Sequence, residues 1–177
     1  GGTPVYAIWN SSDMSPTITL SNGSLTATND GTANGQVRAT VGVSSGKWYW
    51  ETTFHRDVAF GQWITPAGIS KTSELTTQYI GETAGGASWT TDTDGGSFGS
   101  KWSGGTQTTG YNTTSAWVDG DVVGMALDMD AGTITVYRNN VSLGVMYSGL
   151  SGTYYPATGS SFEPGYAIAN FGATAFV

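Results

Sequence analysis

GDVVGMALDMDAGTITVYRNNVSLGVMY, residues 120–147, is the stretch that decides the fold of this chain. It contains three runs rich in β-branched and aromatic residues, at 122–129, 133–138 and 141–147. Apolar and polar side chains alternate in these runs, as is typical of half-buried strands. The runs are separated by Gly132 and by the pair Asn139 and Asn140, which tolerate the positive φ of tight turns. The stretch therefore predicts an antiparallel meander.

A second strong strand signal is SGKWYWETTF, residues 45–54. Alternation places Trp48, Trp50 and Phe54 on one face, and burying such side chains contributes roughly 1.5–3 kcal/mol each, so we expect this face to be core. Trp89 is also expected in the core. Further strand-like runs are 17–20, 25–28, 36–43, 67–70, 79–81, 87–90 and 165–171. Residues 1–16 are expected to form an irregular lead-in.

No helix of useful length is predicted, and strands at short intervals with turns between them favour a two-sheet all-β sandwich. With 177 residues the chain fits one domain, 1–177, that can bury a substantial core. Gly1 and Gly2 are expected to be a cloning or processing remnant.

Several motifs resemble those of the SPRY domain family. The matching positions are Gly120, Asp121, Gly124, Asp128, Tyr137, Asn139, Gly144, Tyr147, Tyr155 and Pro156. SGKWYWE (45–51) resembles the early strand of that family, GSKWSGG (99–105) its Gly-aromatic-Gly hairpin, and NFGATAF (170–176) its closing motif. The resemblance implies an antiparallel, bent, concanavalin A-like β-sandwich. It also implies a non-catalytic recognition domain whose end loops hold partners, usually protein segments.

Composition narrows the class of partner. Only 11% of the residues are charged and the net charge is −7, with six Lys and Arg, so nucleic acid and anionic membranes are poor partners. The chain has no cysteine, which excludes disulfides, a thiolate nucleophile and a Cys-containing zinc site. No run is long and apolar enough to cross a membrane, and no signal peptide is visible.

The sequence does not predict an enzyme. His55 is the only histidine, and no Gly-x-Ser-x-Gly elbow is present. Glycosidases of concanavalin-like fold carry Glu-x-Asp-x-x-Glu on one strand, which is also missing. Glycan degradation is kept as a third alternative, which would need two carboxylates about 5–10 Å apart across a cleft.

Carboxylates occur in pairs at Asp92/Asp94, Asp119/Asp121 and Asp128/Asp130. We expect the last two pairs to cap turns. The run 92–95 resembles the start of a calcium loop, but the glutamate that would complete such a loop is missing. No metal or cofactor is therefore predicted, with calcium kept as the one alternative.

Candidate binding residues lie in the predicted loops 56–66, 72–78, 92–115 and 159–165, where aromatics stand among Gly, Ser, Thr and Asn, as in antibody paratopes. The candidates are Trp63, Asp92, Asp94, Trp102, Tyr111, Asn112 and Phe162. Two alternatives stay open: Trp102 packs on the sandwich, or Trp63 belongs to a half-buried strand with Ile64.

The first part of the chain indicates a source. TITLSNGSLTATN (17–29) and VRATVGVSSGKWYWETTF (37–54) resemble SPRY-type domains of bacteriophage virion and tail proteins. We therefore expect a recognition domain at the virion surface, outside the cell, that binds a host-surface glycan or protein receptor. The alternative is a structural or decoration domain that contacts other virion proteins, and its oligomeric state is left open.

Overall fold

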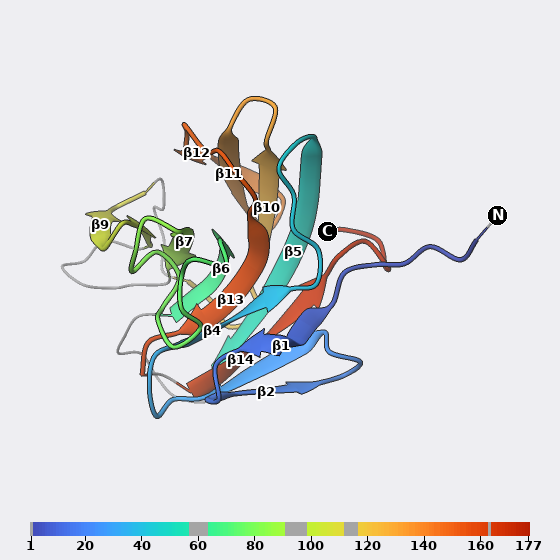
Figure 1. The fold of residues 1–177 in the computed structure, drawn as a ribbon, viewed down its shortest axis with the longest axis vertical. Helices are drawn as coiled ribbons and strands as arrows, with labels where there is room; N and C mark the ends of the chain where they lie inside the picture. Colours follow the sequence, from blue (N-terminus) through green and yellow to red (C-terminus); the bar gives the residue numbers. More distant parts are fainter. Residues whose placement is uncertain (1, 57–63, 91–98, 112–116, 163) are drawn as a thin grey trace.

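The computed structural model describes residues 2–56, 64–90, 99–111, 117–162 and 164–177. In these ranges it contains fourteen β-strands and no helix, so the all-β prediction is confirmed. The strands form two seven-stranded sheets with antiparallel neighbours, and they pack as a sandwich (Figure 1). No helix in the described ranges has the length and apolar character needed to cross a membrane.

Each sheet mixes strands from distant parts of the sequence. The first sheet has the order β1 (Trp9–Met14), β4 (Gly35–Ala39), β13 (Tyr155–Ser160), β6 (Ile64–Ser70), β7 (Gly86–Thr90), β8 (Ser100–Ser103) and β9 (Thr106–Thr109). The second has the order β12 (Val141–Tyr147), β11 (Thr133–Arg138), β10 (Val122–Asp128), β5 (Lys47–Arg56), β14 (Pro164–Asn170), β3 (Thr26–Asp30) and β2 (Ile18–Ser21).

The predicted meander is confirmed in β10, β11 and β12, and β5 extends it. Met125 of β10 pairs with Val136 of β11 on one side and with Trp50 of β5 on the other. Gly132, between β10 and β11, has a φ of 67°, and a Cβ atom there would lie 2.7 Å from the Leu150 carbonyl oxygen. Glycine is therefore required at this turn for both its backbone conformation and its size.

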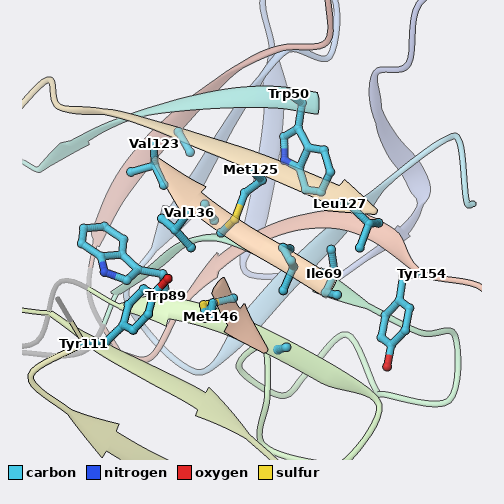
Figure 2. Close-up of a cluster of buried hydrophobic side chains, with 14 of the residues drawn as sticks. Trp50, Ile69, Trp89, Tyr111, Val123, Met125, Leu127, Val136, Met146 and Tyr154 are labelled. Carbon is cyan, nitrogen blue, oxygen red and sulfur yellow. The ribbon is translucent and has the colours of Figure 1, made fainter. Parts of the chain in front are cut away.

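The main core lies between the two sheets. Met125 and Leu127 of β10 are at most 1% exposed, as are Ile69 of β6 and Trp89 of β7 in the facing sheet. Figure 2 shows these side chains gathered in one cluster with Trp50. The predicted core role of Trp89 is thus confirmed, and so is that of Trp50, which is 2% exposed.

The prediction that Trp48 belongs to the core was wrong. Trp48 is 47% exposed, although it alternates in phase with Trp50. It is the second residue of β5, so its side chain lies at the rim of the sandwich, where its indole N–H donates to the Ser45 carbonyl at 2.8 Å. Alternation identified the face correctly, but it does not report where along the strand the core ends.

The expected irregular lead-in contains a strand. β1 pairs with β4 at Trp9 and Met14, with an irregular register between them. Trp9 is fully buried, and its indole N–H donates to the Leu25 carbonyl at 3.0 Å. Its ring packs edge-on against Phe171, 5.1 Å away between centroids. A second, smaller core therefore forms where β1 meets the β2–β3 hairpin.

The predicted strand at 79–81 was also wrong. This segment lies in the connection 71–85, which is organised around the fully buried carboxylate of Glu74. That carboxylate accepts hydrogen bonds from the Gly81 N–H (3.0 Å), the Thr83 N–H (3.2 Å) and the Ser70 hydroxyl (2.9 Å). The backbone is thus paired with a side chain instead of with a neighbouring strand.

The strands end at two opposite ends of the sandwich. We call "loop end" the end formed by residues 31–34, 117–121, 139–140 and 161–162, where the Gly120 N–H donates to the Phe54 carbonyl and the Asn139 N–H to that of Val122. We call "terminus end" the end formed by residues 2–8, 40–46, 130–132 and 171–177, where the Met129 N–H donates to the Gly46 carbonyl. In Figure 1 the N-terminal segment extends away from the body at this end.

Candidate binding site

Phe162 is the most exposed aromatic side chain in the described part of the loop end, at 60% exposure. It lies in the turn between β13 and β14 with a φ of 54°, a conformation that bulky residues rarely adopt and that costs about 1–3 kcal/mol. The neighbouring Ser161 hydroxyl donates to the side-chain oxygen of Asn34 at 2.7 Å, which ties this turn to the β3–β4 connection. Phe162 therefore presents its ring to solvent next to a residue that is hydrogen-bonded to the β3–β4 connection.

His55, near the end of β5, lies at the same end. Its Nδ1 is 3.1 Å from a carboxylate oxygen of Asp119, and its ring stacks on Tyr166 at 4.8 Å between centroids. Such a His–Asp pair occurs in catalytic triads, but a triad also needs a nucleophile. The contacts described for His55 are a carboxylate and an aromatic ring, and neither supplies the hydroxyl or thiol that a triad uses as its nucleophile. The pair thus supplies polar and aromatic surface, which suits recognition.

A buried ion pair between Asp121 and Arg138 lies beneath the turn that carries Asp119. The Asp121 carboxylate accepts hydrogen bonds from the Arg138 guanidinium (2.7 Å from Nε), the Asn139 amide (2.8 Å) and the Val118 N–H (2.9 Å). Burial alone would raise the pKa of Asp121, but these hydrogen bonds and the Arg138 charge outweigh it and lower the pKa. Asp121 therefore fixes the turn that carries Asp119.

Two of the predicted binding residues are buried. Trp102, in β8, is 7% exposed and packs edge-on against Tyr79. Tyr111 is 8% exposed, and its hydroxyl donates to the Gly144 carbonyl of β12 at 2.5 Å. Neither ring offers a face on which a ligand could stack, so the alternative that Trp102 packs on the sandwich describes its position correctly. Trp63, Asp92, Asp94 and Asn112 lie outside the described residues, and their binding role stays a prediction.

The side of the sandwich next to Tyr111 is closed by Lys101, which was not among the predicted binding residues. The Lys101 ammonium donates to the Met146 carbonyl of β12 at 2.8 Å and lies over the ring of Tyr147, 4.7 Å from its centroid. Burial raises the pKa of the Tyr111 and Tyr147 hydroxyls to about 12. We call Lys101 and Tyr111 the clasp, because together they join the 100–111 region to the edge of β12.

The carboxylates near the β10–β11 turn have a structural role, as predicted. One oxygen of Asp128 accepts hydrogen bonds from the N–H groups of Asp130 and Ala131, and the other pairs with Lys47 at 3.2 Å. Asp130 in turn accepts from the Gly46 N–H at 2.8 Å. Among the described residues, no group of three or more His, Asp or Glu side chains could hold a metal ion.

Five of the six Lys and Arg side chains are engaged within the domain. Arg38, Lys47 and Arg138 pair with carboxylates. Lys101 donates to a carbonyl, and Lys71 lies over an aromatic ring. Cations engaged in this way contribute little to an anion-binding surface.

Comparison with known proteins relates this chain to one family. The family model described as "SPRY domain" matches residues 47–173, which is more than half of the chain. The SPRY domain of human HERC1 is similar in structure, with a TM-score of 0.74 and 19% identity over 94% of this chain and 99% of that one. The PSpry domain of TRIM65 gives a TM-score of 0.71 and 18% identity, over 94% and 92% of the two chains.

Stonustoxin also contains this fold. Its structure gives a TM-score of 0.63 and 18% identity, and the match covers 94% of this chain but 27% of the toxin chain. At such identities the solved structures establish the sandwich fold alone, while the family model also matches the sequence. The chain belongs to the SPRY domain family.

Proposed function

We propose that this chain is a non-catalytic recognition domain that binds a protein partner through its loop end. SPRY domains are protein-interaction modules, which supports the general class of function. The observation that carries the proposal for this chain is the Phe162 turn. A rigid sandwich holds an exposed aromatic ring in a strained, tied-down conformation, and aromatic side chains held in place are the usual anchors of binding surfaces.

The surroundings of Phe162 favour recognition over chemistry. The loop end offers the His55–Asp119 pair and the Asn34–Ser161 hydrogen bond as polar groups, but no nucleophile among the contacts described for His55. The basic side chains that the structure describes are engaged internally, so the partner surface is expected to be neutral or basic.

The more specific proposal is that the domain lies at a virion surface, outside the cell, and binds a receptor of the host, either a glycan or a protein. Its support is the resemblance of residues 17–29 and 37–54 to SPRY-type phage domains, together with a composition that has 11% charged residues and no cysteine. We favour a protein receptor over a glycan, because Trp102 and Tyr111, two of the aromatic binding candidates, are buried and offer no ring face on which a sugar could stack.

The test is binding of the labelled domain to a panel of intact bacteria and to their purified surface polysaccharides. The variant Phe162→Asn removes the ring, while Asn tolerates the positive φ of the turn. Val145→Ser is the matched control, because Val145 is 53% exposed but lies within β12. We expect saturable binding to some strains that falls at least tenfold in Phe162→Asn and is unchanged in Val145→Ser. Equal binding by both variants would refute the role of the loop end.

A second candidate function is docking to another protein of the same assembly. An exposed apolar surface is the feature that favours it, and the terminus end carries such a surface. Absence of binding to every strain in the panel would favour this candidate.

A further inference from the structure

An apolar groove lies at the terminus end, opposite the loop end. A cavity of about 270 Å³ opens there between the N-terminal segment and the body of the sandwich, and its walls include Val41, Trp48, Pro156 and Phe171. A second cavity of about 410 Å³ lies along the same segment, beside Leu25 and residues 169–174. We call these two cavities and residues 4–7 between them the terminal groove.

Several large apolar side chains at this groove have high exposed fractions. Trp48 is 47% exposed, Val41 and Tyr6 are each 44% exposed, and Val5 is 95% exposed. A cluster of large apolar side chains in contact with water marks an interaction surface on most soluble proteins. Scattered single residues would carry no such meaning, but these four line one continuous depression.

The side chains that line the terminal groove carry no charge, and few of them are polar. None of the residues that line either cavity is charged, although the chain as a whole has a net charge of −7. The Trp48 indole N–H already donates to Ser45, and the Tyr49 hydroxyl donates to Glu51 at 3.1 Å. A sugar would lose the hydration of its hydroxyl groups here and find few side-chain partners in return, because the free polar groups of the groove lie along the backbone of one extended segment. A charged ligand group would have no counter-ion in the walls.

The backbone beside the cavities is available for pairing. Two hydrogen bonds join Ile8 to Thr40: the Ile8 N–H donates to the Thr40 hydroxyl at 3.2 Å, and the Thr40 N–H donates to the Ile8 carbonyl at 2.8 Å. No hydrogen bond is described for residues 2–7, which precede β1 at the edge of the first sheet. Apart from the nitrogen of Pro4, which carries no hydrogen, their N–H and C=O groups can therefore pair with an added extended chain, as in β-strand addition.

We propose that the terminal groove binds an extended, uncharged segment of a partner protein. One large apolar side chain of that segment, such as Leu, Phe or Trp, occupies the cavity beside Trp48, and its main chain runs along residues 4–7. The size is sufficient, because a cavity of about 150 Å³ already holds benzene. A second copy of this chain is a weaker occupant, since two molecules of net charge −7 repel each other.

The experiment is a selection from a library of short random peptides displayed on yeast, sorted for binding to the domain. Enriched peptides are then titrated against the wild type and three variants. Val41→Asp places a carboxylate in the wall of the groove without touching the core. Leu75→Asp is the matched control, with an exposed apolar residue (64%) outside both cavities. Phe162→Asn reports on the loop end.

We expect the enriched peptides to be uncharged, with one large apolar residue in common. Their affinity should fall at least tenfold in Val41→Asp and stay unchanged in Leu75→Asp and Phe162→Asn. Circular dichroism and melting temperature would check that Val41→Asp is folded. Since Phe162→Asn acts at the other end, failure of this proposal and failure of the loop-end proposal give different results.

Three outcomes would overturn the proposal. The first is a set of peptides that bind Val41→Asp as well as the wild type. The second is a set dominated by charged residues. The third is a wild-type dimer in sedimentation velocity that Val41→Asp dissociates, because the occupant would then be a second copy of the chain.

Discussion

Replacing Asp121 by Ala should strongly destabilise the domain. Asp121 is 7% exposed, and its carboxylate lies 2.5 Å from the Nη2 atom of Arg138, whose side chain is 13% exposed. Removing one partner of such a buried pair costs about 3–5 kcal/mol, because the other charge stays in a poorly solvated place. That is a large part of the total of about 5–15 kcal/mol that holds a typical domain together.

The pH dependence of stability distinguishes the contribution of the Asp121 charge to the free energy of unfolding from the contribution of its size. Asp121→Asn keeps the size and should cost about 1.5–3 kcal/mol near neutral pH, through weakened hydrogen bonds to a charged group. The folded state lowers the pKa of Asp121 below its ordinary 3.8, so its stabilisation is complete above that value. It is lost as the pH falls through the folded-state pKa. The gap between wild type and Asp121→Asn should therefore close in acid.

Urea unfolding followed by tryptophan fluorescence measures both effects. With a slope of about 1–3 kcal/mol per M, the midpoint of Asp121→Ala should fall by on the order of 1–5 M. An Asp121→Ala midpoint equal to that of the wild type would refute the argument. So would a gap between wild type and Asp121→Asn that does not narrow as the pH falls below 3.8, because protonation of Asp121 in the unfolded state then removes the stabilisation that its charge provides.

Further predictions concern the core, the 71–85 connection and the clasp. Trp50→Ala should cost about 3–5 kcal/mol in urea unfolding and Trp48→Ala about 1–2 kcal/mol, so equal losses would contradict the rim position of Trp48. Glu74→Ala leaves buried N–H groups without an acceptor and should cost about 3 kcal/mol or more, with faster amide exchange at Gly81 as the specific sign. In an ultraviolet titration, Tyr111 and Tyr147 should stay protonated at about pH 11 in the folded protein. Ionisation of every tyrosine near pH 10 would speak against their burial.

The meander and the core of the second sheet could be predicted because their signals are local. Val123, Met125 and Leu127 repeat every second residue, and Gly132 marks a turn that no other residue fits. Each of these features depends on neighbours within a few positions in the sequence. The two-sheet sandwich and the family followed from the same stretches.

The exposure of the tryptophans could not be predicted in this way. Trp48 and Trp50 carry the same local signal, and they differ only in their distance from the end of the facing sheet. Trp102 is surrounded by Gly and Ser, which suggests a loop, but it is covered because Tyr79 packs on it. Such outcomes depend on contacts between segments far apart in the chain. Of the predicted binding residues that the structure describes, Trp102 and Tyr111 are therefore buried, and Phe162 is exposed.

The clasp affects how the exposed edge of β12 can pair with a strand of another molecule. The edge strand of a sheet normally offers a row of free carbonyl and N–H groups, onto which a strand of another molecule can add. On β12, the carbonyls of Gly144 and Met146 are already occupied by Tyr111 and Lys101. Two of the carbonyl groups at this edge are therefore closed to strand addition, so the edge should resist the first step toward aggregation when copies of the domain lie close together.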